Sequence, residues 1–285
     1  MTRTPIGRWS AGILSLALLG LVAAGGVAAQ APLSVGLDAT FAPHAMPKMG
    51  GGVEGFNVDM ANEIGRRLGR PMNIVAQEWA GLIPGLQAKR FDFLAAPTTV
   101  TAERAKSLLF TEGYLNTDYQ FVVRRDASDV AGLEQLRGKT IAVNRGSIYD
   151  TWARENAARY GFQVESYNTT TDAIQAVLAG RAFANLAGNT AVAWAVKKNP
   201  DLKLSYTVST GNVFAIPFRK DDAAMRNRVE EAIECMKLDG FFARLSEKWL
   251  GVTPAAGSAA VTVFPGYGTP GFEGYDPTPH TPKCH

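Results

Sequence analysis

Cysteine and histidine are scarce in this chain of 285 residues, which has two cysteines and three histidines. That scarcity argues against a catalytic metal site built from these ligands. Neither sign of charge dominates, because 29 Lys and Arg face 26 Asp and Glu and the net charge is +3. The basic surface of a nucleic-acid-binding protein is therefore not expected. Hydrophobic residues at 46% exclude wholesale disorder, and the length predicts roughly two domains.

Long hydrophobic runs are also missing, except near the N-terminus. Arg3 and Arg8 precede the apolar run Ala11–Ala24, and small residues follow as far as Ala29. This order is typical of a cleaved secretory signal peptide, residues 1–29. The run is short for a retained membrane anchor, which needs about 20 apolar residues. No cysteine lies near the cleavage point, so a lipid anchor is not predicted, and we expect a soluble periplasmic protein.

After this leader, segments with strand character alternate with segments of helical periodicity. Met60, Ile64 and Leu68 fall on one helical face, with Asn57 as the expected cap. This alternation predicts an α/β fold with mostly parallel sheets covered by helices. The expected strands are 33–38, 74–77, 93–95, 140–143, 163–166, 184–187 and 214–217, and the expected helices are 57–68, 82–89, 147–160, 171–179, 190–198, 223–238 and 241–249.

The composition changes at Gly251. Residues 251–285 hold six prolines and six glycines, so they are expected to form an extended tail or wrap without a core of its own. A disulfide between Cys235 and Cys284 would pin this tail to the body, and an oxidising compartment permits it. In the chain-entropy model, such a loop is worth ~4 kcal/mol. The alternative is one buried and one exposed thiol, and the bridge is favoured because an exposed thiol is a liability outside the cell.

Three motif-like matches do not predict a cofactor. The glycines of 50–55 satisfy G-x-G-x-x-G in letters, but no strand precedes them directly. The stretch 132–140 has the wrong spacing for a phosphate-binding loop and leads into a strand. His280 and the terminal Cys284-His285 lie in the tail without a fourth ligand. We therefore expect no cofactor and no metal.

Two predicted helix starts could hold a small anion, because helix starts offer free backbone N–H groups. Thr98, Thr99 and Arg104 follow the buried strand 93–95, and Arg104 could grip a carboxylate through two parallel hydrogen bonds. Gly146 and Ser147 follow the strand 140–143 in the same way. Both starts lie at the carboxyl ends of strands, where open α/β sheets bind ligands. Two ordinary capped helices with a surface arginine would give the same pattern.

Three further side chains follow strands and are weaker candidates. Phe41 and Trp79 could sandwich part of a ligand, although most aromatic residues at such positions belong to the core. Asp38 could meet a cation or merely cap a turn.

Taken together, residues 33–250 resemble the solute-binding proteins of polar amino-acid ABC transporters, the bacterial extracellular solute-binding proteins of family 3. The most specific stretch is Gly55-Phe-Asn-Val-Asp-Met60, in which Asn57 replaces the usual acid. Further matches are 38–43, 79–86, 99–104, 110–114, 133–143, 146–147 and 239–251.

The resemblance implies a periplasmic binding protein fold of type II, with two α/β lobes around a ligand cleft. Lobe 1 would comprise residues 30–123 plus 213–250, and lobe 2 would be the inserted segment 124–212. The crossing strands are expected near 121–123 and 213–215. A monomer would close around a small-molecule ligand and present it to an inner-membrane ABC permease.

The same resemblance implies roles for the candidate residues. Arg104 and Thr99 would grip the α-carboxylate of an amino acid with help from Ser147, while Phe41 and Trp79 would pack on its side chain. Two departures matter, and Pro97 is the first, because it offers no N–H. The second is Gly188, which aligns with the family's acceptor of the α-ammonium. Asn189 is adjacent and could substitute, so the ligand is expected to be an amino acid or a related small organic acid.

Two other functions fit the same fold. A periplasmic lyase similar to cyclohexadienyl dehydratase would need a general acid in the cleft, and Gly188 removes the obvious carboxylate. Alternatively, the binding protein could serve a sensor or a redox system in place of a permease. We favour solute binding, with no enzymatic activity.

Overall fold

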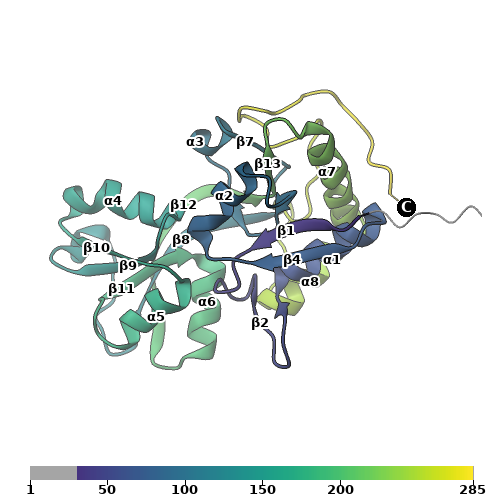
Figure 1. The fold of residues 1–285 in the computed structure, drawn as a ribbon. Helices are drawn as coiled ribbons and strands as arrows, with labels where there is room; N and C mark the ends of the chain where they lie inside the picture. The colour runs from purple at the N-terminus through teal and green to yellow at the C-terminus, as the bar shows by residue number, and fades with distance from the viewer. Residues whose placement is uncertain (1–30, 285) are drawn as a thin grey trace, which may run out of the picture.

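The computed structural model describes residues 31–284 and shows two lobes joined side by side (Figure 1). The α/β class and the two-lobe architecture of a type II binding protein are confirmed. The predicted signal peptide lies outside the described residues. Within residues 31–284, no helix is both long enough and apolar enough to cross a membrane.

The larger lobe is built on a short parallel sheet in the order β4-β1-β5. Two small antiparallel pairs, β2–β3 and β7–β13, flank it. Its strands are β1 (Leu33–Leu37), β2 (Met46–Pro47), β3 (Val53–Glu54), β4 (Met72–Ala76), β5 (Phe93–Leu94), β7 (Leu108–Phe110) and β13 (Pro217–Arg219). Its helices are α1 (Phe56–Leu68), α2 (Trp79–Gln87), α3 (Ala102–Ala105), α7 (Ala223–Leu238) and α8 (Phe241–Leu250).

The smaller lobe contains most of a six-stranded sheet in the order β10-β9-β11-β8-β12-β6. β9, β10 and β11 pair in parallel, whereas β8, β12 and β6 pair antiparallel to their neighbours. The strands are β6 (Thr98–Thr99), β8 (Leu115–Arg124), β9 (Thr140–Asn144), β10 (Gln163–Tyr167), β11 (Ala184–Gly188) and β12 (Leu202–Ala215). The helices are η1 (Leu133–Leu136), α4 (Ile148–Tyr160), α5 (Thr170–Leu178) and α6 (Asn189–Lys198).

The long strands β8 and β12 run from one lobe to the other. Leu115 at the start of β8 packs in the core of the larger lobe, whereas Tyr119 packs in the core of the smaller lobe. In β12, Phe214 pairs with Leu115 and also with Thr99 of β6. The chain therefore leaves one core and enters the other within a few residues. The exact lobe boundaries stay a prediction, and this packing favours a crossing of β8 shortly before 123/124.

Two local expectations are wrong. Asn57 does not cap α1, because the cap is Gly55 and makes no side-chain hydrogen bond. Instead, Asn57 is fully buried and its amide donates to the Ala95 carbonyl and to the Tyr114 hydroxyl at 2.7 Å. The stretch from Thr98 to Arg104 does not open a helix directly either, since Thr98–Thr99 forms β6 and only the single turn α3 follows. Pairing with β12 takes precedence there over helix formation.

The tail after Gly251 lies along the larger lobe and runs past α7 (Figure 1). Its backbone is tied to the body by bonds from the Phe264 N–H to a carboxylate oxygen of Glu112 (2.8 Å) and from the Gly268 N–H to Glu230 (2.6 Å). The predicted disulfide between Cys235 and Cys284 is confirmed. It joins α7 to the end of the tail, so the segment wraps the lobe and is fastened at its far end.

Candidate functional site

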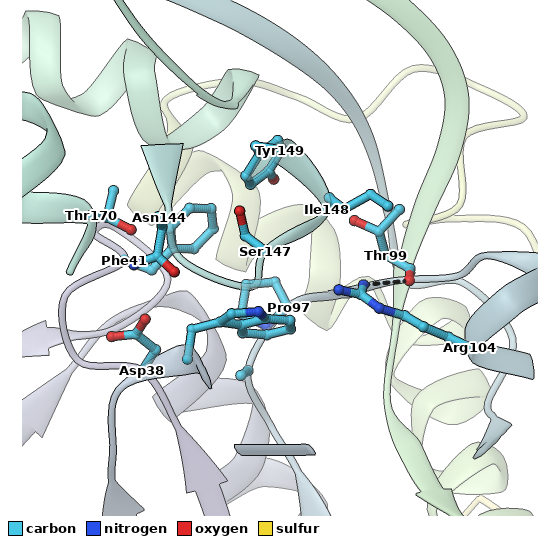
Figure 2. A pocket seen from close by; sticks show the side chains of 12 residues that line it. Asp38, Phe41, Pro97, Thr99, Arg104, Asn144, Ser147, Ile148, Tyr149 and Thr170 are labelled. Carbon is cyan, nitrogen blue, oxygen red and sulfur yellow. Dashed lines mark hydrogen bonds between the residues drawn. The ribbon is translucent and has the colours of Figure 1, made fainter. Parts of the chain in front are cut away.

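A pocket with about 390 Å³ of empty space lies where the two lobes face each other (Figure 2). Segments that follow strands of both lobes supply its walls, as expected for ligand sites of open α/β sheets. The lining residues are Asp38, Phe41, Trp79, Ala96, Pro97, Thr99, Arg104, Asn144, Ser147, Ile148, Tyr149 and Thr170.

Arg104 brings the pocket's positive charge. Thr101 caps the single turn α3 by accepting from the Arg104 backbone N–H, and this turn aims the side chain back toward β6. One guanidinium nitrogen donates to the Thr99 carbonyl at 2.9 Å, and the group lies 5.3 Å from the centre of the Trp79 ring. Burial lowers the pKa of Arg104, and no carboxylate offsets that effect. The guanidinium is thus a desolvated cation without an anionic partner among the described residues.

Ser147 enters the pocket from the smaller lobe at the start of α4. It caps this helix by accepting from the Asp150 backbone N–H at 3.2 Å. Gly146 precedes it with a φ of 69°, a left-handed conformation that glycine adopts without steric cost. The Gly146 N–H donates to the Asp150 carboxylate at 2.9 Å. This turn therefore brings the Ser147 hydroxyl and the start of the helix to the same pocket as Arg104 (Figure 2).

Aromatic rings form the apolar part of the wall. Phe41 stacks on Tyr149 with ring centres 6.4 Å apart, although the two residues belong to different lobes. Burial raises the pKa of the Tyr149 hydroxyl, so it remains a neutral phenol. Trp79 lies at the start of α2, and its indole N–H donates to the Gly146 carbonyl at 2.9 Å.

Asp38 directly follows β1, stands at the start of the next turn and is 4% exposed. One of its oxygens accepts from the Thr40 N–H at 2.8 Å and from the Thr40 hydroxyl at 2.7 Å. Burial raises the pKa of this carboxyl group, and the bonds from Thr40 oppose the rise. Among the described residues that line the pocket, Asp38 is the single carboxylate.

Hydrogen bonds hold the lobes together around the pocket. The Trp79 bond to Gly146 is one of them, and the Thr170 N–H donates to the Thr40 hydroxyl at 3.2 Å. A third contact joins His44 to the Thr190 hydroxyl at 2.7 Å. The lobes are therefore in a closed arrangement.

The structure brings six of the nine predicted ligand residues to the pocket wall, namely Asp38, Phe41, Trp79, Thr99, Arg104 and Ser147. Gly146 contributes through its turn and its carbonyl. Thr98 is buried and its hydroxyl donates to the Ala96 carbonyl at 2.9 Å. Asn189 lies in a separate groove beside Thr190 and Trp194, so it is not placed to substitute for an acid in this pocket. Whether these residues contact a ligand stays a prediction.

Sequence reasoning missed several wall residues. Asn144 ends β9 and Thr170 begins α5, so the rule that strand ends carry ligand groups would have found both. Tyr149 gave no such signal. It is the second residue of α4, and only the packing of the lobes turns its ring toward Phe41.

A separate cluster of buried carboxylates has the composition of a metal site. Single oxygens of Glu112, Glu230 and Glu234 lie within 4.8 Å of one another. The buried ammonium of Lys237 already donates to Glu112 at 2.6 Å, and His280 contacts Glu234 at 2.9 Å. The lysine thus acts as the internal counter-ion of this cluster, which lies outside the pocket wall.

Comparison with known proteins agrees with the geometry. Residues 33–252 match the bacterial extracellular solute-binding proteins, family 3. The L-arginine-binding protein of Pseudomonas aeruginosa is 29% identical over 84% of this chain and 94% of its own length. The L-cystine-binding protein TcyJ of Escherichia coli is 29% identical over 77% of this chain and 82% of its own length.

Solved structures show the same likeness. An ancestral arginine-binding protein bound to arginine has a TM-score of 0.75 at 30% identity, covering 78% of this chain and all of its own. The ancestral amino-acid-binding protein AncCDT-1, described as a precursor of cyclohexadienyl dehydratase, has a TM-score of 0.72 at 27% identity over 77% of this chain and 95% of its own.

The fold and the pocket define a two-lobe binding protein. The chain belongs to the bacterial extracellular solute-binding proteins of family 3. Its role is therefore solute binding.

Proposed function

We propose that this protein captures a small carboxylate in the pocket between its lobes, in the periplasm, and delivers it as a monomer to an ABC permease of the inner membrane. The observation that carries the ligand class is the Arg104 guanidinium, which is desolvated, faces the pocket and has no anionic partner there. A partly buried cation of this kind is costly unless an anion joins it. The relatives named above as binding proteins of arginine and cystine support an amino acid or a related acid.

The carboxylate would lie between Arg104, Thr99 and Ser147. Arginine donates two parallel hydrogen bonds to a carboxylate, and a serine hydroxyl at a helix start adds another donor. Phe41 and Trp79 would contact the remainder of the ligand. Because these groups come from both lobes, the full set is available only when the lobes are closed.

Closure would then depend on the ligand. Contacts made only in the closed state shift the population toward it, and the permease would recognise that state. We place the lobes at residues 30–123 plus 213–250 and at 124–212, with β8 and β12 as the crossing strands. The signal peptide 1–29 would be removed on export.

We further propose that the protein is not an enzyme. The relatives are named for binding, and the pocket wall combines a single carboxylate with no histidine among its described residues. The neighbouring AncCDT-1 structure is itself described as an amino-acid-binding protein, which supports binding for this chain.

The test is a thermal-shift screen of amino acids, amines and small organic acids, followed by calorimetry on the compounds that stabilise the protein. Arg104→Ala should weaken binding of every such compound by at least ~100-fold, as expected for loss of a buried charge-assisted bond worth about 3 kcal/mol. Arg66→Ala removes an arginine that is 63% exposed on α1 and serves as the matched control. Equal affinity of the Arg104→Ala and Arg66→Ala variants would refute the assignment.

A further inference from the structure

Gly188 stands at a position where the backbone does not require glycine. It precedes α6 as its N-cap with a φ of −63°, which any residue adopts. Aspartate, asparagine and serine are favoured at such caps because their side chains accept bonds from the first free N–H groups of the helix. Glycine here therefore needs another explanation.

The explanation is the ring of Tyr149. A Cβ atom on residue 188 would lie 2.7 Å from the Tyr149 hydroxyl oxygen, 3.5 Å from Phe41 and 3.6 Å from Phe214. The first distance is shorter than any normal contact, and the tyrosine is buried. The phenol thus occupies the space that any side chain at 188 would need, and it lines the pocket in its place.

Because residue 188 is glycine, no acid stands at the end of the pocket where Arg104 would hold the ligand's carboxylate. The remaining acid of the wall, Asp38, lies on the other side of the pocket from Arg104 (Figure 2). In an α-amino acid, the ammonium nitrogen and the carboxylate are attached to the same carbon. A ligand held by Arg104 would therefore place an α-ammonium on the Tyr149 side of the pocket, away from Asp38 (Figure 2).

We propose that the pocket selects carboxylic acids that carry no ammonium group on the carbon next to the carboxylate, and that Tyr149 with Gly188 is the determinant of this preference. The proposal rests on the proposed function, because it takes Arg104 as the carboxylate partner. An ammonium buried against a neutral phenol and a phenyl ring loses its hydration without gaining a counter-charge. A hydrogen, hydroxyl or oxo group at the same carbon carries no such penalty, and any positive charge of the ligand belongs at its far end, facing Asp38.

Calorimetry on the unmodified protein tests this with pairs that differ only in the α-ammonium. The pairs are L-arginine with 5-guanidinopentanoate, L-glutamate with glutarate and L-leucine with 4-methylpentanoate. In the pair that binds most tightly, the member without the α-ammonium should bind at least tenfold more tightly. Equal affinities, or tighter binding of the α-amino acid, would overturn the proposal. So would an absence of binding in all pairs, since the pocket would then not be selecting carboxylates by this feature.

A second measurement uses the determinant itself. Combining Tyr149→Ala with Gly188→Asp vacates the space and supplies an acid beside the carboxylate end, so the preference within each pair should shift toward the α-amino acid by at least tenfold. Gly188→Asp alone should lose binding of both members, because its side chain meets the Tyr149 hydroxyl; circular dichroism would check that each variant is folded. An unchanged preference in the folded double variant would overturn the role of Tyr149.

The failure of the proposed function gives a different result. In that case, Arg104→Ala would leave the affinity of every bound compound unchanged. If Arg104→Ala abolishes binding and the α-amino acids still bind more tightly than their partners, the carboxylate site stands and only the selectivity proposal fails.

Discussion

Replacing Lys237 with methionine should destabilise the protein strongly, although the residue lies far along the chain from the pocket segments. Its side chain is fully buried on α7, and its ammonium donates to Glu112 and to the Gly113 carbonyl at 2.6 Å each, and to the Thr262 carbonyl of the tail at 2.8 Å. Breaking a buried pair by removing one partner costs about 3–5 kcal/mol, because the other charge is left buried and uncompensated. We expect a loss of that size in the free energy of unfolding.

Urea unfolding followed by tryptophan fluorescence measures this loss. Lys106→Met is the matched control, because Lys106 also lies 2.6 Å from a carboxylate, that of Glu103, but both side chains are exposed. It should change stability little. The double variant Lys237→Met with Glu112→Gln should recover part of the loss, since no unpaired charge then remains buried.

A loss below about 1 kcal/mol at neutral pH, equal to that of Lys106→Met, would refute the argument that this pair is an internal counter-ion arrangement.

Three further predictions concern the tail, a buried histidine and lobe closure. Replacing Cys284 with serine removes the disulfide to Cys235, which spans a separation of 49 residues. In the chain-entropy model, this loss should lower the free energy of unfolding by ~4 kcal/mol. Equal melting temperatures for the variant, the reduced native protein and the oxidised native protein would contradict this prediction. Burial lowers the pKa of His44 from 6.5 to about 4, so the unfolded chain binds the proton first as the pH falls. The free energy of unfolding should have its full value above pH 6.5 and fall by about 3 kcal/mol on acidification toward pH 4. A His44→Gln variant with the same pH slope would exclude His44 as the source. Trp79→Phe removes the indole hydrogen bond to Gly146, which joins the two lobes. The loss of a net hydrogen bond near 1 kcal/mol should weaken ligand binding by about fivefold, with little change in the free energy of unfolding. Unaltered affinity in calorimetry would show that this contact does not support closure.

Hydrophobic periodicity by itself determined much of the fold. The alternation along residues 33–250 predicted the α/β class, and the buried face of Met60 and Ile64 gave α1 within one residue of its start. Gly180 and Gly251 lie just after α5 and α8 in the left-handed conformation, which glycine adopts readily. The expectation that ligand groups follow strands selected the segments that hold Arg104 and Ser147, and both residues line the pocket.

Long-range pairing, by contrast, was decided only in three dimensions. β12 extends over 14 residues because β8 pairs with it along most of its length, although only its end was predicted as a strand. Asn57 was wrongly predicted to cap a helix. Its buried partners, His44 and Tyr114, lie 13 and 57 residues away in the chain, so local reasoning could not find them.

The sequence by itself determined that this is an α/β protein with an arginine and a serine in segments that follow strands, because these properties follow from local periodicity and from the chemistry of single side chains. The two lobes were implied by the family resemblance. Only the tertiary structure decided what faces them. Gly188 is visible in the sequence as a missing acid, but the reason for it is a phenol that comes from another helix of the same lobe and meets Phe41 from the opposite lobe. Such a contact depends on how the two lobes pack, and packing between distant segments leaves no periodic trace in the chain.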